Sequence, residues 1–445
     1  MKDSQTQSLN QGVDKNEGHQ GLATTSIEAT LKNVLESNNV KRAWQQVKSN
    51  HGTHGVDGMS IDEFPNYART SWEEIRLQLE SNKYYPAAVL RVAIPKRSGG
   101  TRALGIPTVV DRVIQQAIAQ VLTPVFDPDF SESSFGFRPR RSARDAVLSV
   151  SELKSQGYTI AVEVDLKQFF DNVNHDILMH LIAQKVKDKS LLKLIGKYLR
   201  AGVQIDGERE PTRIGVPQGG PISPLLSNIV LDVLDKELEK RGHKFVRYAD
   251  DFVILVKSDR AGARVQASIT RFLARRLKLP VNQDKSRVGK AHKVSFLGFH
   301  FPGKKLQWTD EAFSELKYNL KRLSSRSWGV SFDYRIYKLN QYIRGWTNYF
   351  GISVGYQKLV ELDSWLRRRL RCCLWKEWRY ARTKVRELTK LGTDLKLAIR
   401  HAMSRKSYWR LSKTLATHSG LTNKWFEQQG LCSMKSIWIQ IHYPS

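Results

Sequence analysis

The chain has 445 residues, 40% of them hydrophobic, which allows two or three domains with buried cores and excludes a disordered polyelectrolyte. Its 72 Lys and Arg outnumber its 43 Asp and Glu, and the net charge of +29 indicates a polyanionic partner such as nucleic acid. Three cysteines without a CxxC spacing support neither a disulfide framework nor a zinc site, and no apolar run suits a signal peptide or membrane span. We therefore expect a cytoplasmic protein without membrane association.

The first part of the chain is predicted to contain helices and a basic hairpin. A polar leader, residues 1–26, is expected to be disordered. Residues 84–105 read as strand, Ser-Gly-Gly turn and strand, which predicts a β-hairpin whose tip is bracketed by Lys96 and Arg102. An amphipathic helix is predicted for residues 111–123, ended by the proline that follows.

From residue 158 onward the pattern predicts a split antiparallel sheet. A short apolar strand ends on Asp165, and a later hairpin, residues 245–256, turns at Ala249 and Asp250. Helical patterns lie between these strands, and a further helix, residues 261–279, precedes the last strands. The resulting order is βαββαβ, with carboxylates at the strand ends.

Three carboxylates, Asp165, Asp250 and Asp251, come together if the first strand and the hairpin are neighbours in this sheet. They repel one another unless a divalent cation neutralises them, and hard oxygen ligands suit Mg²⁺ that is also bound by a triphosphate. Two ions about 3.5–4 Å apart would stabilise the attacking primer 3′ oxygen and the leaving pyrophosphate. The ordinary alternative for an Asp-Asp pair is a solvated turn. The apolar runs on both sides of this pair and the second acidic strand end favour the metal site.

Four segments resemble motifs of the reverse transcriptases that bacterial group II introns encode. Residues 248–251, YADD, are similar to the signature hairpin of reverse transcriptases, and residues 164–171, VDLKQFFD, to their first catalytic motif. Residues 215–225, GVPQGGPISPL, resemble the second palm motif of the group II intron branch. Residues 344–350, RGWTNYF, resemble its thumb and maturase block. The resemblance covers roughly residues 30–435.

The resemblance implies an α+β right-hand polymerase fold, with fingers and a βαββαβ palm followed by an α-helical thumb and maturase region. The implied domains are, in chain order, a polar leader (1–26), the N-terminal extension and fingers (27–157), the palm with the catalytic aspartates (158–309), the helical thumb and maturase region (310–415) and a short C-terminal tail (416–445).

The resemblance also implies roles for the charged residues. The three aspartates would be catalytic metal ligands, with Asp250 the more direct ligand of the hairpin pair, for two Mg²⁺ ions that Mn²⁺ can replace. The implied metal ligands are Asp165, Asp250 and Asp251. Lys96 and Arg102 would hold the incoming triphosphate, which their charge and hairpin placement also allow. Their alternative is a basic hairpin tip without a ligand.

Three further residues have implied roles in nucleotide binding or proton transfer. Phe170 would lie beneath the deoxyribose and exclude a 2′ hydroxyl, and its alternative is ordinary core packing beside Phe169. Gln218 would contact nucleotide or template, since the flanking glycines let the backbone approach closely. Lys285 would protonate the leaving pyrophosphate, and its alternative is a surface lysine. Residues 296–299 resemble the primer grip.

The last part of the chain is the most basic. Residues 321–445 contain 25 Lys and Arg but only 7 Asp and Glu. Aromatic residues lie among these charges, namely Trp346, Tyr349, Trp365, Trp375, Trp378 and Trp409. This mixture suits phosphate contact and base stacking, so we expect the segment to bind RNA, with phosphate contacts from residues 367–369 and 405–406. The alternative is that the arginines are solvated and the tryptophans form a core.

The favoured function is that of an RNA-directed DNA polymerase encoded by a group II intron, which also acts as a maturase in splicing and retrohoming. Its expected partners are intron RNA, an RNA template with a DNA primer, deoxynucleoside triphosphates and target DNA, which would bring it to the bacterial nucleoid. The Cys-rich endonuclease domain of many relatives is not expected, because the matching cysteine pairs are missing. The alternatives are a non-catalytic RNA-binding splicing cofactor and a reverse transcriptase domesticated for repair or defence.

Overall fold

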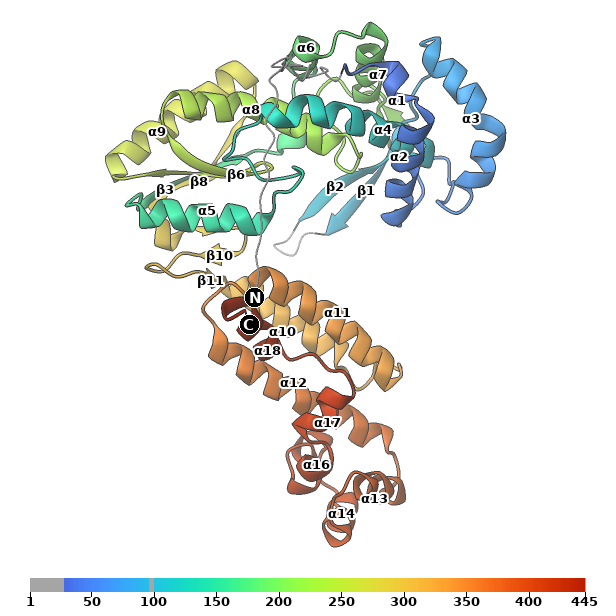
Figure 1. Cartoon of the computed structure of the whole chain (residues 1–445), viewed down its shortest axis with the longest axis vertical. Helices are drawn as coiled ribbons and strands as arrows, with labels where there is room; N and C mark the ends of the chain where they lie inside the picture. The colour runs from blue at the N-terminus through green and yellow to red at the C-terminus, as the bar shows by residue number, and fades with distance from the viewer. Residues whose placement is uncertain (1–27, 96–99, 445) are drawn as a thin grey trace, which may run out of the picture.

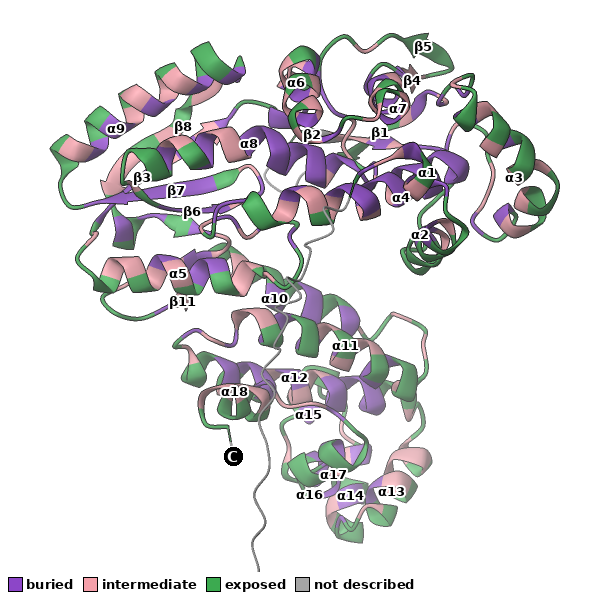
Figure 2. Ribbon diagram, turned by 45° about the horizontal axis from the view of Figure 1, so that its top comes forward, coloured by how far each residue is buried: buried purple, intermediate pink, exposed green. Residues whose placement is uncertain are grey.

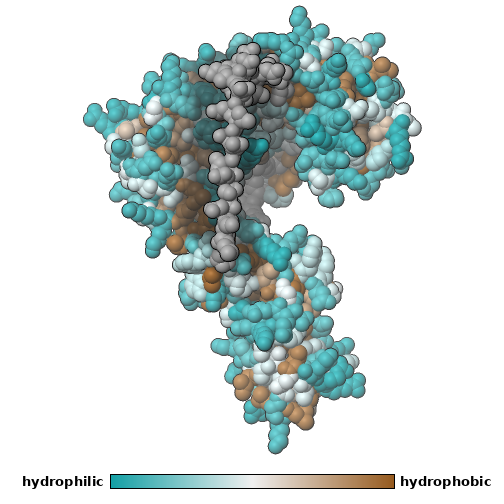
Figure 3. Space-filling model, viewed as in Figure 1, coloured by the Kyte–Doolittle hydropathy of each residue, from teal (hydrophilic) through white to brown (hydrophobic). Residues whose placement is uncertain are grey.

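The computed structural model describes residues 28–95 and 100–444, except for the side chain of Arg102. An α/β part lies above an all-helical part in Figure 1, and the chain passes between them beside a small sheet of order β11-β10-β9. The strands of this sheet are β9 (Ser295–Phe296), β10 (Phe299–His300) and β11 (Gln307–Trp308). The space-filling view shows an open hollow between the two parts (Figure 3). The α+β fold with a helical C-terminal region is therefore confirmed.

The fingers combine helices with a four-stranded sheet. The helices are α1 (Leu31–Val34), α2 (Ser37–Ser49), α3 (Phe64–Glu80), α4 (Val109–Phe126), α6 (His175–Lys185) and α7 (Lys189–Leu199). The sheet has the order β2-β1-β4-β5. Its strands are β1 (Val89–Pro95), β2 (Thr101–Ile106), β4 (Val203–Ile205) and β5 (Glu208–Glu210). The strands of the predicted hairpin are confirmed as the antiparallel pair β1 and β2. Helices α6 and α7 and strands β4 and β5 belong to this part, because β4 pairs with β1, although they lie outside the range predicted for the fingers, residues 27–157.

Helix α4 runs through the middle of this part. The prediction that it ends before Pro124 is wrong, because the helix continues to Phe126. Of its 18 residues, 13 are buried, including Phe126 after the proline. A proline in the last turn removes one backbone hydrogen bond, worth about 1 kcal/mol net, and burial of the following turn outweighs that loss.

The palm is an antiparallel sheet of order β6-β7-β3-β8. Its strands are β3 (Ile160–Leu166), β6 (Lys244–Tyr248), β7 (Asp251–Val256) and β8 (Val281–Lys290). Helices α8 (Ser223–Lys240) and α9 (Asp259–Phe272) cover one face, and α5 (Ala143–Ser155) packs on the other (Figure 2). The predicted βαββαβ order is confirmed. The helix predicted for residues 261–279 starts earlier and ends in a π-helical turn, Leu273–Leu277.

The thumb is a bundle of long helices with a cluster of short ones at its far end (Figure 1). The bundle contains α10 (Asp310–Leu323), α11 (Phe332–Phe350), α12 (Tyr356–Glu377) and α18 (Met434–His442). The short helices are α13 (Ala381–Lys390), α14 (Leu395–Ala402), α15 (Tyr408–Leu411), α16 (Leu415–Gly420) and α17 (Asn423–Gln428). None of the described helices is both long and apolar enough to span a bilayer.

The segment expected as a short tail, residues 416–445, is built into the thumb. Leu421, Phe426 and Met434 are buried in the same core as α10, α11 and α12. The carboxylate of Asp363 on α12 accepts hydrogen bonds from the backbone N–H groups of Met434 and Lys435, at 3.1 Å each. These contacts hold the start of α18 against α12, because a carboxylate near a helix N-terminus is stabilised by the helix dipole.

Candidate active site

Two of the three predicted catalytic aspartates lie on the same face of the palm. The apolar residues at even positions of β3 pack toward α8 and α9, so Asp165 projects from the opposite face. Strand β7 alternates in the same way and brings Asp251 to that face as well. In the pairing of the two strands Glu163 lies opposite Val253, and the same register continued for two residues sets Asp165 opposite Asp251. The carboxylates of adjacent strands are therefore neighbours.

Asp165 and Asp251 line one open pocket together with Lys285 of β8. Lys285 is exposed, so its ammonium group is available to an anion that enters the pocket. The fold thus brings this lysine to the same pocket as two of the aspartates. Its role as a proton donor stays a prediction.

Asp250 lies one residue earlier, in the tight turn between β6 and β7. It is half-buried and is not among the residues that line the pocket of Asp165. Within residues 28–95 and 100–444, no three His, Cys, Asp or Glu side chains are grouped closely enough to hold a metal ion by themselves. The two neighbouring carboxylates still fit Mg²⁺, which commonly binds one or two carboxylates and takes its other ligands from substrate phosphates and water. The three-aspartate site stays a prediction.

A bulge in β8 holds the backbone of Asp165 in place. The β3–β8 register shifts between Glu163 and Asp165, and Asp165 pairs with Asn282. In this bulge the Ser286 hydroxyl accepts a 3.0 Å hydrogen bond from the Asp165 N–H and donates one of 2.6 Å to the Asn282 carbonyl. No feature of the sequence predicts this contact, since a serine in a polar strand has many possible partners. Ser286 fixes the backbone of the residue whose carboxylate enters the pocket.

The loop that carries Gln218 joins the fingers to the palm. The Gln218 carbonyl accepts a 2.6 Å hydrogen bond from the N–H of Gly105 in β2, and the N–H of Val216 donates one of 2.7 Å to the Phe170 carbonyl. A Cβ at Gly219, where φ is 117°, would stand 2.4 Å from the Gly105 carbonyl oxygen, so only glycine fits. The backbone of this loop therefore packs directly against β2, and its predicted close approach to a nucleotide or template stays a prediction. Gln218 lines an open pocket, and its contact with nucleotide stays a prediction.

Phe170 is almost fully buried, with 7% of its surface exposed, and its ring packs edge-on against Phe169 at 5.2 Å between centroids. Core packing, the alternative to a role beneath the deoxyribose, therefore describes its present contacts. The exclusion of a 2′ hydroxyl by its ring stays a prediction. Of the triphosphate-binding pair, Lys96 lies outside the described residues. The backbone of Arg102 pairs with Ile94 in the hairpin, and its side chain is not described.

Base stacking by the thumb tryptophans is contradicted for two of them. Trp375 is fully buried, and Trp346 is 8% exposed, so neither ring can reach an RNA base from the surface. Trp346 instead packs against Trp308 and Phe350, with ring centroids 5.4 and 4.8 Å apart. The prediction was wrong for these two residues because tryptophan is suited both to buried cores and to nucleic-acid-binding surfaces, and the sequence alone does not distinguish the two. Trp409 is 40% exposed and remains available.

The arginine run 367–369 is partly used inside the thumb. Arg369 donates to the hydroxyl of Ser324 at 2.6 Å and to the carbonyl of Lys321 at 2.9 Å, which caps the C-terminal end of α10. Arg368 stacks over the ring of Trp409 at 3.8 Å and donates to its carbonyl. Arg405 and Lys406 are exposed. Residues 405–406 are thus better candidates for phosphate contact than residues 367–369.

Two family models match the chain in the order of its domains. The model described as "Reverse transcriptase (RNA-dependent DNA polymerase)" matches residues 94–301, and that described as "Group II intron, maturase-specific domain" matches residues 313–392. Protein YkfC of Escherichia coli is 30% identical over 331 residues, which cover 65% of this chain and 86% of that protein. The group II intron-encoded protein LtrA of Lactococcus lactis is 29% identical over 58% of this chain. An uncharacterised protein in the cob intron of Schizosaccharomyces pombe is 36% identical over 46% of this chain.

The chain belongs to the family of group II intron-encoded reverse transcriptases, in which a polymerase is followed by a maturase-specific domain. It covers about half of LtrA, 54% of that protein's length, and a quarter of the cob intron protein. Polymerases in general act with divalent metal ions, and a maturase domain implies an RNA partner.

Proposed function

We propose that this protein copies RNA into DNA from a primer with two Mg²⁺ ions, and that as a maturase it binds group II intron RNA to promote splicing and retrohoming. The observation that best supports polymerisation is the pocket that Asp165 and Asp251 share with Lys285. The two adjacent carboxylates suit the metal ion, and the positive charge of the lysine suits the triphosphate that the metal ion binds. The proposal extends to target DNA as a partner in retrohoming.

In this proposal Asp165, Asp250 and Asp251 hold the metal ions, which supply charge stabilisation for the attacking and leaving oxygens. The chain's own residues orient the nucleotide. Its triphosphate would lie between the basic hairpin and Lys285, which donates a proton to the departing pyrophosphate. The remaining roles are triphosphate binding by Lys96 and Arg102, sugar discrimination by Phe170 and a nucleotide or template contact by Gln218. The loop of Gln218 is hydrogen-bonded to both fingers and palm, so it couples these groups.

Basic and aromatic residues on the surface of the thumb support the RNA-binding half of the proposal. Figure 3 shows hydrophilic and hydrophobic residues side by side at the far end of the molecule, which the short helices form. Exposed Arg405 and Lys406 lie in this end, as does Trp409, which stacks with Arg368. A charged surface with accessible aromatic rings suits a folded RNA, whose phosphates dominate affinity.

The direct test uses the purified full chain with an RNA template, an annealed DNA primer and deoxynucleoside triphosphates, while Mg²⁺ is titrated. We expect full-length DNA that depends on RNA template and on Mg²⁺. A second assay measures self-splicing of group II intron RNA with and without the protein at limiting Mg²⁺. Faster splicing without any primer extension would replace the proposal by that of a non-catalytic splicing cofactor.

A further inference from the structure

A buried arginine stands directly behind the turn that carries Asp250. Arg247 is the last but one residue of β6, and its side chain is fully buried. Its guanidinium is paired with the carboxylate of Asp235 on α8, through Nε at 2.8 Å and Nη2 at 2.5 Å. A fully buried ion pair stabilises a fold only when its geometry is good and its other donors have partners. The contacts of the remaining N–H donors of Arg247 therefore decide whether this ion pair stabilises the fold.

The third nitrogen of Arg247 is directed at the turn. Nη1 donates to the side-chain oxygen of Asn228 at 2.9 Å and to the main-chain carbonyl of Ala249 at 3.0 Å. Ala249 directly precedes Asp250 and has φ of 56°, a left-handed conformation that costs a non-glycine residue free energy. The guanidinium group of Arg247 thus binds the carbonyl of this strained residue, and Asp235 and Asn228 of α8 hold the guanidinium in turn. The position of the Asp250 backbone thus depends on Arg247.

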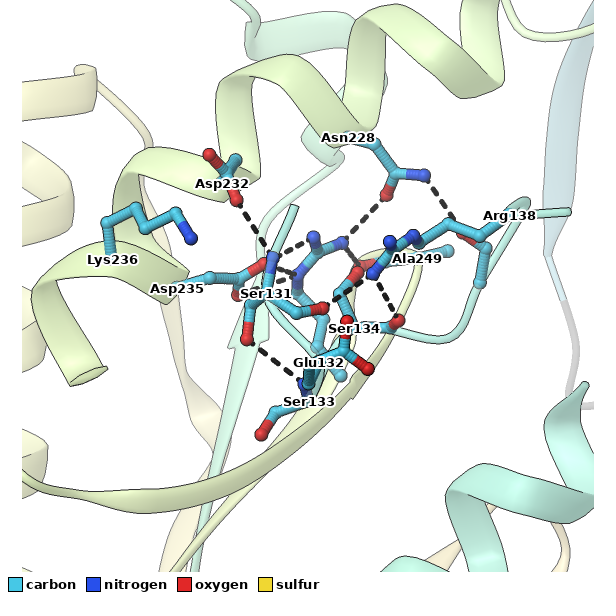
Figure 4. A network of polar contacts seen from close by, with 12 residues as sticks. Ser131, Glu132, Ser133, Ser134, Arg138, Asn228, Asp232, Asp235, Lys236 and Ala249 are labelled. Carbon is cyan, nitrogen blue, oxygen red and sulfur yellow. Dashed lines mark hydrogen bonds and ion pairs between the residues drawn. The ribbon is translucent and has the colours of Figure 1, made fainter. Parts of the chain in front are cut away.

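The loop of residues 133–136 also contacts this turn. The Asn228 amide donates to the Gly136 carbonyl at 2.9 Å, and Gly136 lies so close to the turn that a Cβ there would be 2.2 Å from the Ala249 nitrogen. The main chain of Arg247 is bonded to Ser133 and Phe135, at 2.9 Å each. Figure 4 shows Asn228, Asp235, Ala249 and the Ser131–Ser134 loop in one network of polar contacts. Arg247, which α8 holds, and the loop before α5 therefore contact the turn at Ala249, while Asp251 stays exposed.

We propose that Arg247 is a positioning residue, which holds the Ala249 carbonyl and thereby places the Asp250 carboxylate for metal binding. The proposal rests on the polymerase function proposed above. Lysine at this position keeps the charge next to Asp235. Its single nitrogen cannot take the places of Nε, Nη1 and Nη2, so it cannot keep the paired bonds to Asp235 together with those to Asn228 and Ala249. The Arg247→Lys variant therefore separates an electrostatic role in folding from a geometric role at the turn.

In the full chain, Arg247→Lys should lower kcat of primer extension by about tenfold to a hundredfold, as expected when a catalytic group is displaced. It should also raise the half-saturating Mg²⁺ concentration by about tenfold, in the range seen when residues that orient metal ligands are replaced. The dissociation constant for primer and template should stay within about twofold, because the nucleic-acid contacts are unchanged. Asn228→Ala, which leaves no buried charge unpaired, should act in the same direction more weakly.

The matched control is Arg335→Lys. Arg335 is also buried, but it lies in the thumb, where it donates to the carbonyls of Leu323 at 3.1 Å and Ser325 at 2.7 Å. Its replacement should lower the melting temperature without changing the Mg²⁺ requirement. If Arg335→Lys shifts that requirement as much as Arg247→Lys does, the effect is general loosening and the proposal is wrong.

Hydrogen exchange supplies a readout that does not need activity. Amides of residues 245–253 should exchange faster in Arg247→Lys and Asn228→Ala than in the wild type, while those of α12 should not change. Wild-type exchange in both variants would overturn the positioning role. Failure of the wild type to extend a primer would instead contradict the proposed function alone. Should Arg247→Lys fail to fold, Asn228→Ala decides, and wild-type kcat and Mg²⁺ requirement in that variant would overturn the proposal.

Discussion

The hydroxyl of Tyr349, at the end of α11, donates a 2.9 Å hydrogen bond to the main-chain carbonyl of Leu297 in the palm. Leu297 has φ of 49° and is followed by Gly298 at 81°, so this bond fixes a tight turn in the segment that resembles the primer grip. Burial raises the pKa of Tyr349 to about 12, and the hydroxyl therefore remains a donor at any pH at which a polymerase is assayed. The thumb and the palm are linked through this contact.

The first prediction concerns this link. Tyr349→Phe should destabilise the protein by only about 0.5–1.5 kcal/mol, the net value of one such hydrogen bond. It should shorten the DNA made per binding event, because the primer-grip turn is no longer held by the thumb. Product length is measured with an excess of unlabelled trap template. Tyr318→Phe, at an exposed position on α10, is the control, and equal product lengths in all three proteins would contradict the prediction.

The second prediction concerns sugar selection by Phe170. Phe170→Val should raise kcat/KM for ribonucleotides relative to deoxyribonucleotides, because a smaller side chain leaves room for a 2′ hydroxyl. Since the ring is buried, the variant should also lose about 2–4 kcal/mol of stability. Phe169→Val, equally buried in the same core, controls for that loss. The prediction is contradicted if folded Phe170→Val has an unchanged ratio of kcat/KM values, or if both variants change that ratio equally. Phe170 would then have only a packing role.

The third prediction concerns RNA binding by the thumb. Replacing Arg405 and Lys406 by alanine should weaken binding to intron RNA and flatten the plot of log K against log salt by roughly one to two units, about 0.7–0.9 for each lost phosphate contact. Arg369→Ala should mainly lower the melting temperature, because that side chain caps α10. Titration at several salt concentrations separates the two effects. An unchanged slope for the double variant removes these residues from the RNA surface.

The fourth prediction concerns pH and Asp232 on α8. Burial, together with the nearby Asp235 carboxylate, raises the pKa of Asp232 to about 6. Because this value lies above that of the unfolded chain, the folded protein binds an extra proton between pH 4 and 6. Its contribution to stability is present below about pH 4 and is lost as pH rises through 6, by at most about 3 kcal/mol.

Asp232→Asn mimics the protonated side chain at every pH. The variant should gain stability relative to the wild type as pH rises from 4 to 7, with most of the change below pH 6.5. Chemical denaturation of both proteins across this range measures the difference. A stability difference that does not vary with pH would show that Asp232 titrates normally.

The sequence predicted the palm and its carboxylates because both depend on local patterns. Alternation with a period of two sets the face of each strand residue, and the turn between β6 and β7 follows from two apolar runs around Asp250. The contacts of Ser286 and Arg247 were not predictable in the same way. Ser286 meets Asp165 across 121 residues, and a buried arginine looks the same in sequence as an exposed one. Trp346 was misread for that reason too, since burial is decided by tertiary packing.

The central claim is that the carboxylate of Asp250 binds catalytic metal ions and does not hold nucleic acid. The most direct measurement compares Asp250→Ala with the wild type on one preparation, for primer extension with Mg²⁺ and for affinity to RNA. Asp259→Ala, which removes an exposed carboxylate at the start of α9, is the control. The account predicts that extension by Asp250→Ala falls to background while RNA affinity and melting temperature stay near those of the wild type. Substantial Mg²⁺-dependent extension by this variant would contradict the account.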